Sequence, residues 1–145
     1  MITEYLEKNK TLLNFEANNY QHALEKMLAV SERKNHAEII QMILKREALM
    51  PTAIGKSVAL PRTILNDQMK TELIIAISPT GINLNSLDHL PVKIIFLYLF
   101  SANDNYPSFL AQSLRLLNDG NLRPELLKAK TEDELIKSIK TWEQG

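Results

Sequence analysis

The sequence predicts an α/β domain built around a mixed β-sheet. Two aliphatic runs, residues 71–78 and 92–100, have the length and composition of strands buried inside a sheet. Stretches with apolar residues at helical spacing precede and follow them, so helices and strands alternate along the chain. With 145 residues, 45% of them hydrophobic, the chain is long enough for one sizeable core. No repeat or linker divides it, and we expect a single domain over residues 1–145.

The N-terminal elements are predicted from short apolar patterns. Residues 2–8 favour a short helix, and residues 11–15, TLLNF, a short strand. Asn18 or Asn19 is suited to cap the next helix, because a short polar side chain can accept a hydrogen bond from the first free amides. The apolar residues of this helix recur on one side: Ala23, Leu24, Met27, Leu28 and Val30.

A second helix follows, with Asn35 as its candidate cap. Its predicted buried stripe consists of Ile39, Ile40, Ile43 and Leu44. Met50 and Pro51 should end it, because proline has no amide hydrogen for the helix ladder. Arg46 and Glu47 are therefore expected to lie at the C-terminal end of this helix.

Three strands are predicted in the middle of the chain: residues 57–60, residues 71–78 and residues 92–100. The run over 92–100 is interrupted only by Lys93 and is far shorter than the roughly 20 residues that a membrane-spanning helix needs. It is therefore read as a buried strand. Residues 78–90 contain proline, glycine and asparagine and are predicted to form a loop.

The C-terminal third is predicted to be helical. Pro107 suits the first turn of a helix that ends at Gly120 and buries Leu110, Leu114 and Leu117. Residues 121–127 favour another short helix. Thr131 and Glu134 have the spacing of a capping box. They open a final helix whose expected buried residues are Leu135, Ile136, Ile139 and Trp142.

Composition excludes several classes of function. Seventeen basic and seventeen acidic residues give no formal net charge, so the basic field that nonspecific nucleic-acid binding requires is absent. No cysteine is present for a disulfide, a thiolate nucleophile or a thiolate metal site. The first ten residues lack the basic start and apolar run of a secretory signal. We expect a cytoplasmic protein without membrane insertion, and no feature points to a cofactor.

The most informative segment runs from Lys45 to Arg62 and reads KREALMPTAIGKSVALPR. It resembles the active-site pattern of the enzyme IIA domains in the fructose, mannitol and nitrogen-regulatory branch of the bacterial phosphotransferase system. The positions in step with that pattern are Arg46, Glu47, Thr52, Ile54, Gly55, Val58, Ala59, Leu60 and Pro61, and further along Ile82, Asp88, Pro91 and Val92. The resemblance covers nearly the whole chain and implies a central sheet of about five strands flanked by helices.

Arg62 stands where the resemblance implies the phosphoacceptor histidine. A neutral imidazole has a lone pair that can attack phosphorus and carry the phosphoryl group. A guanidinium stays protonated, with a pKa above roughly 12, and has no such lone pair. Arg62 can therefore bind a phosphate but cannot carry one, and no residue of the chain is assigned a catalytic role.

The resemblance also implies roles for the residues around this position. Arg46 matches the arginine that pairs with the phosphoryl group, although a helix-end arginine can also bond the carbonyls of its own helix. Glu47 pairs with a neighbouring arginine or is a solvated acid. Tyr106 falls where the family has a second histidine. Together with Arg62 these residues form the predicted phosphate or anion pocket, and Gly55 is expected to supply a backbone conformation that other residues avoid.

The three histidines, His22, His36 and His89, have no spacing typical of a metal site. A substitute phosphoacceptor at His89 is conceivable, although the family pattern gives that position no chemical role.

Two functional hypotheses remain. The first is a regulatory or protein-interaction module, of the stand-alone nitrogen-regulatory type, that cannot be phosphorylated at the usual position. The second is an active phosphocarrier of a sugar phosphotransferase system, using a displaced acceptor or representing a substituted form of a histidine protein. Expected partners are proteins, either an HPr-like phosphocarrier or a regulatory kinase or transporter. The sequence leaves the sugar and the oligomeric state open.

Overall fold

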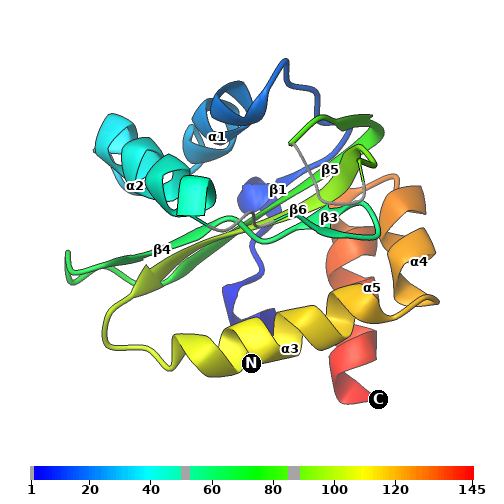
Figure 1. Ribbon diagram of the computed structural model, residues 1–145. Helices are drawn as coiled ribbons and strands as arrows, with labels where there is room; N and C mark the ends of the chain where they lie inside the picture. Colours follow the sequence, from blue (N-terminus) through cyan, green and yellow to red (C-terminus); the bar gives the residue numbers. More distant parts are fainter. Residues whose placement is uncertain (1, 50–52, 85–88) are drawn as a thin grey trace.

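A computed structural model of the chain describes residues 2–49, 53–84 and 89–145. Figure 1 shows a twisted sheet with α1 and α2 on one face and α3, α4 and α5 on the other. The strands are β1 (Thr11–Leu12), β2 (Ala53–Gly55), β3 (Val58–Ala59), β4 (Arg62–Leu65), β5 (Glu72–Ile82) and β6 (Val92–Ser101). The helices are α1 (Tyr20–Leu28), α2 (His36–Leu49), α3 (Tyr106–Asn118), α4 (Leu122–Lys128) and α5 (Glu132–Gln144).

The sheet is mixed, as the sequence predicts. Its order is β1-β5-β6-β3-β2, and β4 pairs with β6 outside this path. β5 and β6 are antiparallel. β1 pairs with β5 in parallel, and β3 and β4 each pair with β6 in parallel. β3 and β4 pair with successive parts of the same edge of β6, so the predicted sheet of about five strands contains one further short segment.

Each face of the sheet is covered by its own apolar core. The first core joins α1 and α2 to inward-facing residues such as Ile74, Ala76 and Leu97. The second joins α3, α4 and α5 to the alternate residues of the same strands, including Ile75 and Phe96. β5 and β6 are therefore apolar on both faces, which explains why their sequences read as continuous aliphatic runs.

The helix caps follow the predicted chemistry. The Asn19 side chain accepts a hydrogen bond from the amide of His22 at 2.8 Å, and Thr131 Oγ1 accepts one from Glu134 at 3.1 Å. The carboxylate of Glu134 bonds the amide of Lys130 at 2.9 Å, so it closes the capping box one residue earlier than expected. Of the four predicted buried residues of α5, Leu135 and Ile139 are fully buried, while Ile136 and Trp142 are only partly buried.

The N-terminal segment differs from the prediction. The expected helix over residues 2–8 is instead two short 3₁₀ segments, Ile2–Tyr5 and Lys8–Lys10. The expected strand over 11–15 is limited to Thr11–Leu12, because Asn14 has a left-handed φ of 51° that breaks the extended backbone. Pairing resumes for one bond at Phe15, whose amide donates to the carbonyl of Ile77 at 2.9 Å.

Two further corrections concern the strands. The prediction that residues 78–90 form a loop was wrong at its start, because β5 continues to Ile82. A shift in register between Ile77 and Ile82 accommodates Pro79 and also Gly81, which has a φ of 84°. The predicted strand over 57–60 is shorter, and β4 was not among the predicted strands.

A tight turn leads into the predicted site. Gly55 has a φ of 93°, as expected for a backbone conformation that favours glycine, and Lys56 and Ser57 are also left-handed. The turn reverses the chain from β2 into β3, which then leads through Pro61 to Arg62. α2 ends at Leu49, but the predicted stop at Met50 and Pro51, and the motif residues Thr52 and Asp88, lie outside the described residues.

Candidate functional site

Arg62 is the first residue of β4 and is held by its own backbone and by a nearby carbonyl. Its backbone pairs with Tyr98 in β6, and its Nη1 donates to the carbonyl oxygen of Leu60 at 3.1 Å. The side chain is half-buried. Its Nε is buried and has no hydrogen-bond partner in the described part of the chain. One donor of the guanidinium is therefore satisfied, and the Nε hydrogen is buried without an acceptor among the described residues.

Side chains from α1 and α2 act electrostatically on this guanidinium. Burial lowers the pKa of Arg62, and the positive charge of Arg46 lowers it further. The negative charge of Glu47 and the hydroxyl group of Tyr20 act in the opposite direction. Tyr20 also donates to Glu47 Oε2 at 3.1 Å. We refer to Tyr20, Arg46, Glu47 and Arg62 as the Arg62 cluster.

The Arg62 cluster carries two positive charges and one negative charge. α2 packs against β4, which brings Arg46 and Glu47, in the last turn of the helix, toward the strand that begins with Arg62. Neither arginine forms an ion pair with a carboxylate of the described residues. These arginines cannot act as nucleophiles at neutral pH, and the phosphate or anion pocket stays a prediction.

Tyr106 lies on the other face of the sheet. It begins α3, and its ring lies 5.7 Å from that of Phe100, against the second core. Among the described side chains no hydrogen bond or ion pair joins it to the Arg62 cluster. Three of the four predicted pocket residues are thus brought together. The place of Tyr106 in the pocket stays a prediction, and Tyr20 was missed because no spacing connects it to Glu47, 27 residues away.

The histidines take part in local contacts or are exposed. His22 Nδ1 accepts a hydrogen bond from the amide of Asn18 at 3.0 Å. His36 Nε2 lies 2.7 Å from the carbonyl oxygen of Arg33, to which it donates. His89 is exposed and has a φ of 60°. None of these contacts involves the Arg62 cluster.

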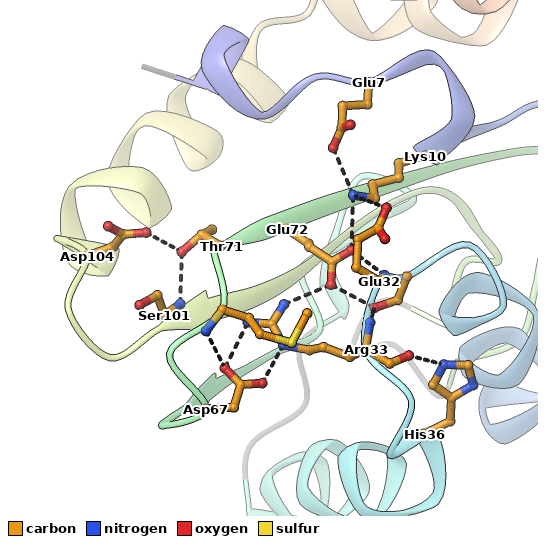
Figure 2. A network of polar contacts seen from close by, with 12 residues as sticks. Glu7, Lys10, Glu32, Arg33, His36, Asp67, Thr71, Glu72, Ser101 and Asp104 are labelled. Atoms are coloured by element: carbon orange, nitrogen blue, oxygen red, sulfur yellow. Dashed lines mark hydrogen bonds and ion pairs between the residues drawn. The ribbon is translucent and has the colours of Figure 1, made fainter.

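A second polar centre, which the sequence did not suggest, lies at the start of β5 (Figure 2). Glu72 is only 5% exposed. Its carboxylate accepts three hydrogen bonds, from Ser31 Oγ at 2.7 Å, from the amide of Glu32 at 2.9 Å and from Arg33 Nη1 at 2.8 Å. Lys10 Nζ lies 3.1 Å from the same carboxylate. Burial alone raises the pKa of Glu72, but these hydrogen bonds and charges outweigh burial and lower it.

Arg33 extends this network to the loop before β5. It is 1% exposed, and its Nε donates to Asp67 at 2.8 Å, which lowers the pKa of that carboxyl group. A pocket of about 680 Å³ opens beside the network, lined by Glu4, Tyr5, Glu7, Lys10, Glu32, Gln68, Met69, Lys70, Thr71 and Glu72. The buried charges at its floor are already paired with one another, so removing one of them would leave another buried charge without its partner.

Within residues 2–49, 53–84 and 89–145, no helix combines the length and apolar character needed to cross a bilayer.

Comparison with known proteins places the chain in a family. Residues 4–142 match the family model of the phosphoenolpyruvate-dependent sugar phosphotransferase system, EIIA 2. The chain is 28% identical over 143 residues to the nitrogen regulatory protein of Bradyrhizobium diazoefficiens, covering 95% of this chain and 93% of that protein. It is 27% identical over 144 residues to the fructose-specific EIIABC component of Bacillus subtilis, covering 95% of this chain but only 23% of that longer protein.

Solved structures show the same fold. The nitrogen regulatory protein IIA-Ntr from Neisseria meningitidis superposes with a TM-score of 0.84 at 20% identity, covering 95% of this chain and 98% of that one. The enzyme IIAMtl structure, determined in complex with phosphorylated enzyme IIBMtl from Escherichia coli, gives a TM-score of 0.79 at 20% identity, covering 94% and 97% of the chains. The chain therefore belongs to the EIIA type 2 family of the phosphoenolpyruvate-dependent sugar phosphotransferase system.

Proposed function

We propose that this protein is an enzyme IIA-like regulatory module of the nitrogen-regulatory type, which binds partner proteins but does not accept a phosphoryl group at the family's usual position. The observation that carries this proposal is the guanidinium of Arg62, which is half-buried beside Arg46 and fixed to the carbonyl of Leu60. We infer that this arginine occupies the position of the phosphoacceptor histidine. The protein would act in the cytoplasm.

The chemistry of the two side chains supports the proposal. Phosphoryl transfer to a side chain needs a lone pair that can be aligned with the phosphorus atom. Burial and Arg46 lower the pKa of Arg62, but a guanidinium remains protonated in proteins at neutral pH. The position therefore retains the ability to bind an anion and loses the ability to form a covalent phosphoenzyme.

The relatives support a regulatory role and indicate the kind of partner. The nitrogen regulatory protein of Bradyrhizobium diazoefficiens is matched over almost its full length. Enzyme IIAMtl forms a complex with phosphorylated enzyme IIBMtl. We propose that this chain likewise binds protein components of a phosphotransferase system, such as an HPr-like phosphocarrier, or a kinase or transporter that such a system regulates.

A phosphotransfer assay tests the proposal. The chain is incubated with phosphoenolpyruvate, enzyme I and HPr, and its intact mass is measured under alkaline conditions that preserve phosphohistidine. We expect no added phosphate on the wild type and only a trace on Arg62→His, because an isolated imidazole lacks a pocket that aligns it. Arg115→His is a control for an added surface histidine, since Arg115 is an exposed residue of α3.

The competing function is an active phosphocarrier with a displaced acceptor. The fructose-specific EIIABC component among the relatives and the exposure of His89 favour it. It predicts stoichiometric phosphate on His22, His36 or His89 of the wild type. Finding that modification would exclude the inactive module, and replacement of the modified histidine by glutamine would identify the acceptor.

A further inference from the structure

The pocket beside the Glu72 network shares no residue with the Arg62 cluster. Its volume of about 680 Å³ is typical of a site for a small molecule. Its lining comes from three separate segments: residues 4–10 near the N-terminus, Glu32 between α1 and α2, and residues 68–72 at the start of β5. A compound bound in this pocket therefore contacts all three segments at once.

Two apolar side chains form part of the pocket wall. The ring of Tyr5 packs edge-on against that of Phe109, with the ring centroids 5.0 Å apart. Met69 is 36% exposed, and its amide donates to Asp67 Oδ1 at 3.1 Å. Asp67 is in turn held by Arg33. These contacts fix an aromatic and a thioether surface in advance, and such a wall favours a compound with an apolar body.

The lining has more negative than positive charge. It contains four glutamates and two lysines, so its formal charge is −2. Figure 2 shows that three of these glutamates, Glu7, Glu32 and Glu72, converge on the Nζ of Lys10, at 2.8, 3.8 and 3.1 Å. Lys10 is only 3% exposed. The structure therefore already places one ammonium group among carboxylates from three segments, which shows that the floor of the pocket suits such a group.

The carboxylates of Glu32 and Glu7 keep capacity to bind a second cation. Among the described residues, Glu32 has one cationic neighbour, Lys10, and the 3.8 Å between them exceeds hydrogen-bond distance. The Glu32 side chain is 66% exposed. Glu7 uses Oε2 for Lys10 and is 52% exposed. Because an ionised carboxylate can accept several hydrogen bonds, both groups can bind a further ammonium without displacing Lys10.

We propose that this pocket binds a small organic cation, an aliphatic diamine. One ammonium group binds the carboxylates of Glu7 and Glu32, and the methylene chain lies against Tyr5 and Met69. The two positive charges match the formal charge of the lining. The hydrocarbon chain matches the apolar wall, which a metal ion cannot use. This site goes beyond the proposed function, because it needs neither a phosphoryl group nor any residue of the Arg62 cluster.

Calorimetric titration of the full chain at constant ionic strength tests the site. The probes are 1,5-diaminopentane, pentylamine, 1,5-pentanediol, glutarate and Mg²⁺. We expect 1,5-diaminopentane to bind about tenfold more tightly than pentylamine, since a second ammonium adds charge-assisted hydrogen bonds. The neutral diol and the dianion should not bind measurably. Mg²⁺ has the same charge as the diamine but no apolar body, so it should bind more weakly. The diamine should also raise the melting temperature, because it binds only the folded arrangement of the three segments.

Four variants separate the contributions. Glu32→Gln should weaken binding of the diamine about fivefold, and it keeps the backbone amide that donates to Glu72. Met69→Ala should weaken binding of both the diamine and pentylamine, because both use the apolar wall. Lys70→Gln should tighten binding of the diamine, because it removes a positive charge from the lining. Glu25→Gln removes the same charge as Glu32→Gln from an exposed position of α1 outside the pocket, and it should change nothing.

Thermal unfolding without a probe establishes that each variant is folded. The diamine site is excluded if 1,5-diaminopentane shows no saturable binding, or if pentylamine, glutarate or Mg²⁺ binds as tightly as the diamine. Equal weakening by Glu32→Gln and Glu25→Gln would also exclude it, because such a result would reflect the charge of the whole chain. The phosphotransfer assay uses none of these probes or variants, so the failure of one proposal leaves the other standing.

Discussion

Replacing Glu72 by glutamine should strongly destabilise the protein. The substitution preserves shape but removes the negative charge that two buried cations share, Lys10 at 3.1 Å and Arg33 at 2.8 Å. It also replaces one acceptor oxygen of the carboxylate by an NH₂ group. That group is a donor and would face neighbours that are themselves donors. Breaking a buried ion pair by removing one partner costs about 3–5 kcal/mol. We expect about 3 kcal/mol, the lower end of that range, because Arg33 keeps Asp67 and Lys10 keeps Glu7.

Equilibrium unfolding in urea measures this loss directly. For a domain of this size, 3 kcal/mol corresponds to a fall of about 10 °C in the melting temperature. The control is Lys8→Gln, which breaks the ion pair between Lys8 and Asp133, whose side chains are 65% and 74% exposed. An exposed pair contributes little, so this variant should lose less than about 0.5 kcal/mol. Equal losses in the two variants, or a loss below about 1 kcal/mol for Glu72→Gln, would refute the role assigned to the network.

The wild type and Glu72→Gln should also differ in how their stability depends on pH. The pKa values of Glu72 and Asp67 lie below their ordinary values of 4.5 and 3.8. A carboxyl group with a lowered pKa in the folded state contributes stability above its ordinary pKa and loses it as the pH falls through the folded value. The wild type should therefore lose stability as the pH falls below 4.5, and Glu72→Gln should lose less over that interval. Parallel curves for both proteins would contradict this assignment.

Two further substitutions test packing away from the site. Gly81→Ala should cost about 2 kcal/mol or more in urea unfolding, because Gly81 has a φ of 84° and an added Cβ would lie 2.6 Å from Pro91 Cβ. Gly120→Ala is the near-neutral control, because its added Cβ would lie 4.0 Å from Arg123 Nη2. Ser113→Ala should cost about 1–3 kcal/mol, because it removes the 2.6 Å partner of the buried Tyr98 hydroxyl group. Tyr98→Phe should cost less than Ser113→Ala, and the opposite order would contradict this reasoning.

Sequence reasoning predicted the elements whose pattern is long and regular. α2, α5 and β6 follow from apolar residues at fixed spacing, because each element buries a continuous stripe or face. β4 was missed because its four residues derive their strand conformation from pairing with β6, a contact that no local pattern encodes.

The candidate site was predicted by motif and completed by structure. Arg46, Glu47 and Arg62 could be grouped because a family pattern spans them, although 15 positions separate Glu47 from Arg62. Tyr20 has no such pattern and enters only through its hydrogen bond to Glu47. The Glu72 network lay beyond sequence reasoning for the same reason. Lys10, Arg33 and Glu72 meet only after three separate segments have packed together.

The two ends of the described chain are fastened together. Thr3 donates through its amide and its hydroxyl group to the carboxylate of Glu143, at 3.2 and 3.0 Å, beside α5. Both ends lie on the side of the sheet covered by α3, α4 and α5, whereas α2 lies on the other side (Figure 1). An affinity tag, a fluorophore or a fused domain attached at either end thus lies on the side of the sheet opposite α1 and α2. The protein can be immobilised by its termini with the face covered by α1 and α2 turned toward the solution.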